Sequence, residues 1–492
     1  MNPRLLLPLF LFTLFTSATS AIGEENEAPN ILFITIDDLN NWVGYLGGHP
    51  QVQTPHIDRL AARGVAFTDA HCTTPICKPS RTAFLTGLSE TKTGVFTNGG
   101  DFDFDDYTLL PEHFAANGYE TYGTGKIHHS KSNQKFFQHS FNPEQRWSPF
   151  DKKEVQYRAK ELPSKGSAKP QHLIKNGPGG NDYILPLNGM PSERKPNNAD
   201  GESFDWGAFA LPDDAFGDGQ ITQWAIEQLK AHEASPKPYF MGVGYYRPHI
   251  PLFAPKKYFD LYPLETLELP QVKADDLDDL PPLGLERALT ATTAGTHQLV
   301  EEHGQWKQAV QAYLASVSFI DAQIGKLLDY LDESPHGKKT IVVLFSDHGW
   351  HLGEKQTWGK FSGWIHSTHV PFIIADLRTE GGAPCGASVS LLDIYPTLVD
   401  LTETSASAPE LDGRSLVPLL ENPSQNSDRV IRTWVGETTY SLINQDWHFI
   451  HYAEGQEELY DRNEDPLEFN NLAGKEGHAQ IIEQLKRQSI GN

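Results

Sequence analysis

Residues 31–36 read Ile-Leu-Phe-Ile-Thr-Ile and lead directly into Asp37-Asp38. A continuous apolar, β-branched run of this length is typical of a strand that is buried on both faces of a parallel sheet. Residues 239–245, 341–345 and 371–375 form three more such runs. Between them, apolar residues from Val310 to Leu331 recur at alternating spacings of three and four, which predicts an amphipathic helix packed on the sheet. Strands that alternate with helices predict an α/β fold with a mainly parallel sheet.

The composition is that of a large globular protein with strong negative charge. The chain has 492 residues, of which 38% are hydrophobic and 21% charged, and 40 Lys and Arg stand against 64 Asp and Glu, a net charge of −24. At roughly 150 residues per domain, this length predicts about three domains, or one large α/β domain with a smaller partner. The composition excludes a disordered or fibrous chain. The negative electrostatic potential of the whole chain disfavours binding to nucleic acid or to an anionic membrane.

The first 21 residues predict a secretory signal peptide. Arg4 precedes an apolar run over residues 5–15, and small residues follow up to Ala21. The run is shorter than the about 20 residues that span a bilayer, and no later run approaches that length, so we expect an exported protein without a membrane-inserted segment. A membrane-tethered N-terminus is the alternative. No Asn-x-Ser/Thr acceptor occurs, which favours a bacterial protein of the periplasm or the medium.

Two further segments differ from the rest of the chain. Residues 126–200 carry 13 Lys and Arg against 7 Asp and Glu, so we expect a basic, loop-rich insertion at about 130–205 that borders a binding pocket; a solvated loop without a role is the alternative. After the polar residues 421–428, strand-like runs occupy 430–435 and 447–452. We therefore expect a main domain over 28–424 and a smaller C-terminal α+β domain over 425–492.

Acidic pairs follow two of the predicted strands. Asp37-Asp38 follows the first strand, and Asp347-His348 follows the strand at 341–345. Ligands of open α/β sheets bind beyond the carboxyl ends of the strands, and acidic pairs that meet there repel each other unless a cation lies between them. Carboxylate oxygens suit Ca²⁺ or Mg²⁺. The alternative is that each pair caps a helix.

A cysteine begins a predicted helix farther along the chain. The segment Cys77-Lys78-Pro79-Ser80-Arg81-Thr82-Ala83-Phe84-Leu85-Thr86-Gly87 has a proline suited to the first turn and a glycine suited to the end. Cys77 would lie at the positive end of this helix with Arg81 close by, as a reactive thiol. A structural cysteine is the alternative. A disulfide between the other two cysteines, Cys72 and Cys385, is left open.

The motif Cys77-x-Pro79-Ser80-Arg81, continuing to Leu85-Thr86-Gly87, resembles the signature of the type I sulfatases. The resemblance extends over about residues 28–475 and is similar in detail to the iduronate-2-sulfatase branch. Its other segments are Gly125-Lys126 with His129, Arg247-Pro248-His249-Ile250-Pro251, Gly353-Glu354 with Trp358-x-Lys360, Glu458-Leu459-Tyr460-Asp461, and Asp465-Pro466 through Asn471-Leu472-Ala473.

The resemblance implies an alkaline-phosphatase-like sandwich, with a large, mainly parallel sheet flanked by helices and a smaller C-terminal α+β domain. It implies one Ca²⁺ per subunit, held by Asp37, Asp38, Cys77, Asp347 and His348. Many sulfatases have Asn where this chain has His348, and imidazole is a softer donor than Ca²⁺ prefers, so a weak metal ligand and a sulfate contact both remain open for His348.

The resemblance also implies that Cys77 is oxidised to formylglycine (3-oxoalanine) by a formylglycine-generating or an anaerobic sulfatase-maturating enzyme. The aldehyde hydrates to a gem-diol, one hydroxyl attacks sulfur, and the second allows the sulfo-enzyme to expel sulfate. By motif position, Arg81 and Lys126 hold the formylglycine oxygens, His129 is the base, His249 is the acid and Lys360 binds sulfate. His128 is the competitor for the role of His129.

The implied activity is hydrolysis of a sulfate ester on a polysaccharide or oligosaccharide. A phosphonate or phosphate ester hydrolase of the same superfamily is the alternative, and a non-catalytic calcium- or glycan-binding relative is a third reading. The sequence does not identify the sugar, the sulfate position, exo or endo action, or the oligomeric state.

Overall fold

The structure is a computed structural model that describes residues 28–490 except 130–132, 144–145, 153–154, 156–171, 191–202, 293–294 and 426. The predicted signal peptide and much of the predicted basic insertion lie outside these residues. Among the described residues, no helix is long and apolar enough to cross a membrane.

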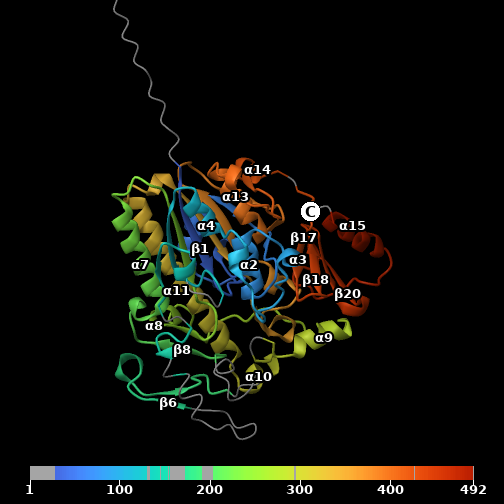
Figure 1. The fold of residues 1–492 in the computed structure, drawn as a ribbon. Helices are drawn as coiled ribbons and strands as arrows, with labels where there is room; N and C mark the ends of the chain where they lie inside the picture. Colours follow the sequence, from blue (N-terminus) through green and yellow to red (C-terminus); the bar gives the residue numbers. More distant parts are fainter. Residues whose placement is uncertain are drawn as a thin grey trace, which may run out of the picture.

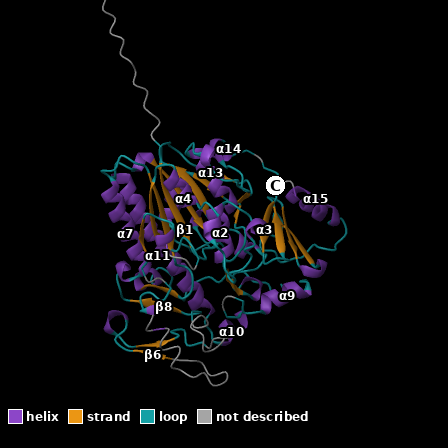
Figure 2. Ribbon diagram, viewed as in Figure 1, coloured by secondary structure: helices purple, strands orange, loops and turns teal. Residues whose placement is uncertain are grey.

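An eight-stranded sheet forms the centre of the molecule (Figures 1 and 2). Five neighbouring strands in the order β11, β1, β9, β4 and β5 are parallel, while β14 is antiparallel to both β11 and β2. In spatial order the strands are β15 (Ala383–Cys385), β2 (Val65–Phe67), β14 (Phe372–Asp376), β11 (Thr340–Ser346), β1 (Asn30–Ile36), β9 (Tyr239–Tyr245), β4 (Glu120–Gly125) and β5 (His139–Phe141). All four strands predicted from apolar runs are present, and the prediction of a mainly parallel sheet is confirmed.

Strand β1 lies in the middle of the sheet and is buried along its whole length. Its side chains alternate between two cores, as the two-residue period of a strand requires. Leu32, Ile34 and Ile36 pack on one face, while Ile31 and Phe33 pack on the other. A strand that contributes apolar side chains to both cores needs the unbroken apolar run found in the sequence.

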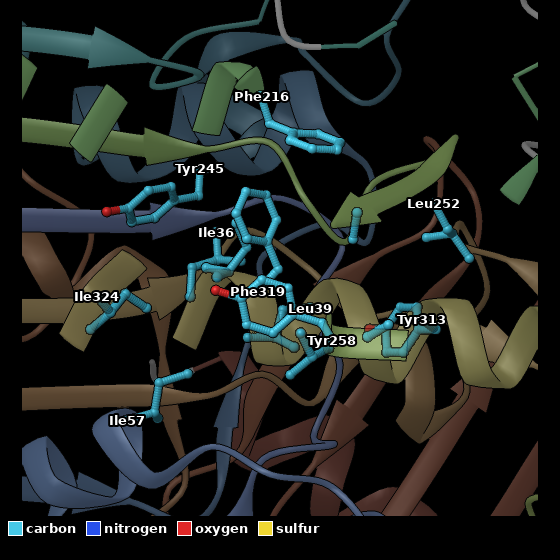
Figure 3. Packing of buried hydrophobic residues seen from close by; sticks show 14 of the residues in the cluster. Ile36, Leu39, Ile57, Phe216, Tyr245, Leu252, Tyr258, Tyr313, Phe319 and Ile324 are labelled. Carbon is cyan, nitrogen blue, oxygen red and sulfur yellow. The ribbon is translucent and has the colours of Figure 1, made fainter. Parts of the chain in front are cut away.

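Helices cover both faces of the sheet. The core on the first face includes α1 (Pro55–Ala61), α7 (Gly217–His232) and α11 (Trp306–Glu333); Figure 3 shows Ile57, Phe319 and Ile324 packed near Ile36 and Tyr245. The core on the second face includes α2 (Cys77–Thr86), α4 (Leu110–Ala116) and α13 (Ile394–Leu401). The predicted helix from Val310 to Leu331 is therefore confirmed as the central part of α11.

Shorter elements surround these layers. Further helices of the described residues are α3 (Glu90–Thr93), α8 (Lys256–Phe259), α9 (Pro282–Leu289), α10 (His297–Glu302), α12 (Ile365–Thr368) and α14 (Val417–Glu421). The described residues also form four two-stranded pairs: β3 (Ala70–His71) with β16 (Val389–Ser390), β6 (His172–Ile174) with β7 (Tyr183–Leu185), β8 (Trp206–Phe209) with β10 (Leu252–Pro255), and β12 (His351–Leu352) with β13 (Trp358–Gly359).

A second, antiparallel sheet lies near the C-terminus, beside the central layers (Figures 1 and 2). Its strands are β17 (Ile431–Trp434), β18 (Tyr440–Ile443), β19 (Trp447–His451) and β20 (Glu457–Asp461), and α15 (Ala479–Ile490) packs on it through Ile482 and Leu485. The expected smaller C-terminal α+β unit is therefore present. Its boundary at residue 425 stays a prediction.

Candidate active site

The predicted site residues meet at one end of the central sheet. Asp37 and Asp38 follow β1, and Asp347 follows β11 after Ser346, which is in register with Ile36. Lys126 follows β4, and Cys77 is the first residue of α2. Parallel strands bring the groups at their carboxyl ends to the same edge, so residues up to 310 positions apart in sequence become neighbours.

Backbone contacts place Lys126 at this edge of the central sheet. Gly125 adopts a left-handed φ of 71°, and Lys126 donates its N–H to the carbonyl oxygen of Gly244 over 2.8 Å. A Cβ atom on Gly125 would lie 2.0 Å from the carbonyl oxygen of Gly244. Only glycine permits β4 and β9 to approach this closely, which explains why a glycine precedes the lysine.

Cys77 lies in the centre of a group of cations and imidazoles. Its Sγ is 3.0 Å from Lys360 Nζ, 3.4 Å from His348 Nε2 and 3.5 Å from Lys126 Nζ. Burial alone would raise the pKa of the thiol, but the nearby charges of Lys126, Lys360 and His348 hold it well below its usual range. The site therefore stabilises negative charge at residue 77.

Three buried carboxylates balance these cations. Arg81 donates from Nε to Asp347 Oδ2 over 2.8 Å and from Nη2 to Asp37 Oδ1 over 3.2 Å. Lys126 contacts Asp37, and Lys360 Nζ is 2.6 Å from Asp38 Oδ1. The charges are thus paired inside a buried site, where each pair is held by a fixed geometry.

Asp38 is the least satisfied of the three carboxylates. Its φ of 65° lies in the left-handed region, and no described hydrogen-bond partner reaches its buried Oδ2 atom. Burial raises the pKa of this carboxyl to about 7, against the opposing effect of Lys360. A strained, buried and partly unpaired carboxylate indicates a group that receives another ligand.

Four of the five predicted metal ligands form one cluster. Ligand atoms of Asp37, Asp38, Cys77 and His348 all lie within 4.8 Å of one another. Asp347, the fifth predicted ligand, lies beside this cluster, because its Oδ2 is 3.5 Å from His348 Nε2. Its carboxylate also accepts hydrogen bonds from Arg81 Nε and, over 3.2 Å, from the N–H of Asp38. The carboxylates and the unpaired Oδ2 fit a divalent cation, whereas the thiol of Cys77 does not suit a hard one.

The structure separates the two neighbouring histidines. The side chain of His129 interacts with that of Cys77. His128 turns the other way and stacks on Phe136 with ring centroids 4.2 Å apart. Its burial, together with Arg81, lowers the pKa of His128 to about 3, so it is a neutral ring in an aromatic core.

His249 faces the cluster from the loop after β9. Its Nδ1 is 2.6 Å from the carbonyl oxygen of Ile250, which makes Nδ1 the donor of the neutral ring and directs Nε2 to Asp38 Oδ2, 3.9 Å away. Burial and the charge of Lys360 lower the pKa of His249 to about 3. Nε2 is therefore a bare nitrogen in this structure.

Two residues that the sequence analysis did not single out, Tyr246 and Asp218, support this loop together with Arg247 of the quoted motif. Tyr246 packs between Lys126 Nζ, 5.0 Å from its ring centroid, and the ring of His249 at 4.9 Å. Asp218 accepts the N–H groups of Tyr246 and Arg247 over 2.6 and 3.4 Å. The guanidinium of Arg247 donates to the carbonyl oxygens of Phe253 and Ser148. The adjacent motif could have indicated Tyr246, but nothing in the sequence indicated Asp218.

The other two cysteines are not joined. Cys72 and Cys385 are both buried and both free, as is Cys77. Cys72 instead directs its Sγ to the carbonyl oxygen of Ser367, 3.7 Å away. The structure therefore contains no disulfide between them.

Comparison with known proteins agrees with this geometry. The sulfatase family profile matches residues 29–404, and the profile of the C-terminal part of N-sulphoglucosamine sulphohydrolase matches residues 353–491. A sulfatase of Formosa agariphila is 35% identical over 98% of this chain and 90% of its own. Human iduronate 2-sulfatase is 29% identical over 74% of this chain and 64% of its own.

Solved structures share the fold at lower identity. A structure in complex with its substrate D-glucosamine-2-N,6-O-disulfate aligns with a TM-score of 0.70 at 21% identity, covering 94% of this chain and 97% of that one. The phosphonate monoester hydrolase of Agrobacterium radiobacter aligns with a TM-score of 0.72, also at 21% identity, covering 94% and 96%. The expected sandwich architecture is thus confirmed, and the chain belongs to the sulfatase family.

Proposed function

We propose that this sulfatase removes sulfate from a sulfated saccharide and that it does so after Cys77 has been converted to formylglycine. The observation that carries the proposal is the position of Cys77 at the start of α2, in contact with Lys126, Lys360 and His348. A sulfate ester is an anion, so a nucleophile at residue 77 needs surrounding positive charge to approach it. Relatives named iduronate 2-sulfatase and ulvan-active sulfatase support a carbohydrate substrate.

The proposed cofactor is one Ca²⁺ ion, held by Asp37, Asp38, Asp347, His348 and residue 77 after conversion. Conversion replaces the sulfur with oxygen, which leaves His348 as the single soft donor of the set. Once in place, the converted side chain would supply an oxygen nucleophile and the cation would lower the pKa of that oxygen.

The protein side chains would then place and move the protons. Arg81 and Lys126 hold the oxygens of residue 77 and balance their charge, and Lys360 binds a sulfate oxygen. His129 removes a proton at residue 77, and His249 donates one from Nε2 to the leaving alcohol. Because Nε2 of His249 is bare in this structure, the sulfate ester must raise its pKa on binding, as a nearby anion does.

The substrate class is tested with converted enzyme and three matched esters: aryl sulfate, aryl phosphate and aryl phosphonate. Conversion is first verified by the mass of the peptide that contains residue 77. We expect the sulfate ester to be hydrolysed with the highest kcat/KM, and we expect Cys77→Ala to lose this activity. Preference for the phosphonate would favour the alternative hydrolase, and undiminished turnover by Cys77→Ala would refute the mechanism.

The position of Arg146 favours a saccharide substrate that carries a second negative charge. Among the described residues of the basic segment 126–200, it lies next to the site: its carbonyl oxygen accepts from Arg247 Nη2 over 3.1 Å, and its own Nη2 donates to Ser203 Oγ over 3.0 Å. Burial raises the pKa of the Tyr246 hydroxyl, and Arg146 and Lys126 oppose this effect, so several cations surround that ring. We propose that a carboxylate or a second sulfate of the sugar binds here.

Arg146→Gln should therefore raise KM more for a sulfated uronic acid or a disulfated sugar than for an aryl sulfate. Comparing the two sugars identifies which anion is bound. Lys135→Gln is the matched control, because Lys135 belongs to the same basic segment but pairs with Asp105 and its side chain is 41% exposed. Equal effects of Arg146→Gln on all three substrates would contradict the proposal.

We also propose that the protein is exported and that a formylglycine-generating or an anaerobic sulfatase-maturating enzyme converts Cys77. Support comes from the N-terminal sequence pattern and the Cys77-x-Pro79-Ser80-Arg81 motif. N-terminal sequencing of protein from the periplasm and the medium tests the cleavage after residue 21.

A further inference from the structure

We propose that the unconverted chain binds a thiolate-seeking divalent metal, such as Zn²⁺, through Asp37, Asp38, Cys77 and His348, and that conversion of Cys77 changes the preference of this site to a hard cation. The first half concerns the cysteine form alone. The second half rests on the proposed function, because it requires formylglycine at residue 77.

Two of the distances between donor atoms are close to those around a small tetrahedral ion. Cys77 Sγ and His348 Nε2 are 3.4 Å apart, and His348 Nε2 and Asp38 Oδ1 are 3.5 Å apart. With Zn–S at about 2.3 Å and Zn–N and Zn–O at about 2.0–2.1 Å, tetrahedral donors lie about 3.6 Å (S to N) and about 3.3 Å (N to O) from each other. Coordination would also require Lys360 Nζ, which lies 2.6 Å from Asp38 Oδ1 and 3.0 Å from Cys77 Sγ, to move away from these two donors.

Two features make atoms of this cluster available to a metal. His348 Nδ1 lies 3.1 Å from the carbonyl oxygen of Gly349, so Nδ1 is the donor of the neutral ring, and Nε2, 3.4 Å from Cys77 Sγ, can bind a metal once its proton has left. Asp38 Oδ2 is fully buried and has no hydrogen-bond partner among the described residues. An unpaired carboxylate oxygen inside a dry site is costly, and a bound cation removes that cost.

The chemistry of the donors distinguishes the two metals. Ca²⁺ takes six to eight oxygen ligands, whereas sulfur and nitrogen make up half of this set. Thiolate, imidazole and carboxylate together are the donors that Zn²⁺ prefers. Binding forms S–Zn and N–Zn bonds, any proton on the Cys77 thiol or on His348 Nε2 passes to the buffer, and no electron is transferred.

The charge of the site also favours the cysteine form as a metal binder. A metal-bound thiolate at Cys77 would add a fourth negative charge to those of Asp37, Asp38 and Asp347, which are paired with the cations of Arg81, Lys126 and Lys360. Replacement of the thiolate by an aldehyde removes that negative charge together with the soft donor. Both changes lower the affinity for Zn²⁺ and leave an oxygen in its place.

The test uses full-length protein from a host without a converting enzyme, with cysteine at residue 77 verified by peptide mass. Titration with Co²⁺ should give one ion per chain, a thiolate-to-cobalt charge-transfer band and intense visible bands of a tetrahedral ion. Zn²⁺ should displace Co²⁺, and we expect Zn²⁺ to bind at least about 100-fold more tightly than Ca²⁺. Zn²⁺ should also protect Cys77 from alkylation, as measured by mass spectrometry.

Two variants show whether the charge-transfer band comes from Cys77. Cys77→Ser should lose the charge-transfer band, whereas Cys385→Ser, which removes another buried thiol, should keep it. Binding of Co²⁺ without that band, persistence of the band in Cys77→Ser, or equal displacement by Ca²⁺ and Zn²⁺ would overturn the inference. Sulfate ester turnover by converted protein is measured separately, so failure of the proposed function and failure of this inference are distinguishable.

Discussion

At the scale of single residues, the site is a balance of buried charges around residue 77. Arg81 bridges Asp37 and Asp347, while Lys360 bridges Asp38 and Cys77. Each cation therefore has two functions: it satisfies a carboxylate that would otherwise be buried unpaired, and it stabilises negative charge on the nucleophile. Loss of one of these cations leaves the other members of the network uncompensated.

The two adjacent histidines give a matched prediction. His129→Gln should lower kcat about 10²–10⁴-fold, because it removes a proton acceptor beside residue 77. His128→Phe should keep near-normal turnover, because His128 packs against Phe136 and Phe104 and its ring is uncharged. Steady-state kinetics on an aryl sulfate measure both. A larger loss in His128→Phe than in His129→Gln would reverse the assignment.

The sequence predicted which residues form the site better than it predicted which residues hold them in place. Cys77, Asp37 and Lys360 were recognisable because each belongs to a motif in which residue type and spacing both match. Asp218 was not, because a single carboxylate at the start of a helix has no distinctive local pattern. Its role depends on the fold, which places it against the backbone of Tyr246 and Arg247.

At the scale of elements, apolar periodicity predicted the strands and the long helix, but not how they are capped. The predicted start and end of α2 are confirmed: Cys77 is its first residue and Gly87, with a φ of 70°, follows its last. The start of α1 is different, because its N-cap Thr54 makes no side-chain capping hydrogen bond. Asp321 of α11 accepts the N–H groups of His56 and Ile57 instead. A cap supplied from another helix cannot be identified from local sequence.

This cap predicts a pH-dependent stability. Burial raises the pKa of Asp321 to about 7, assisted by the charge of Asp58 and opposed by Arg59. The folded protein therefore binds the proton more tightly than the unfolded chain, and the resulting stability is complete below pH 3.8 and is lost as the pH rises through about 7. Asp321→Asn keeps the accepting oxygen but does not titrate, so its Tm relative to the wild type should rise between pH 5 and pH 8.

Asp329→Asn is the control for this experiment. Asp329 lies on the same helix, but its side chain is 58% exposed. Melting curves of the three proteins across that pH range should show the changing difference for Asp321→Asn alone. A constant difference between Asp321→Asn and the wild type would mean that Asp321 keeps its ordinary pKa in the folded protein.

At the scale of the whole molecule, the C-terminal sheet supports the loop that carries Lys360. Trp364, four residues after Lys360, is fully buried among Ile450, Tyr452 and Tyr460. Its Nε1 donates to Glu458 Oε2 over 2.8 Å, and the same carboxylate accepts the hydroxyls of both tyrosines. The sequence predicted a smaller C-terminal unit from its strand pattern, but its contact with the site is a tertiary relation that periodicity does not encode.

This contact predicts that a change distant from the bound sulfate will affect its binding. Trp364→Phe keeps most of the apolar volume but leaves Glu458 with two of its three donors, which should cost about 1–3 kcal/mol and lower Tm. Because the loop then loses its fixed attachment, Lys360 Nζ should be less well positioned and KM for an aryl sulfate should rise. Trp447→Phe, on the part of the same sheet that faces α15, should lower Tm without changing KM. Calorimetry and steady-state kinetics on both variants separate the two effects, and an unchanged KM in Trp364→Phe would show that the loop holds its position without the C-terminal sheet.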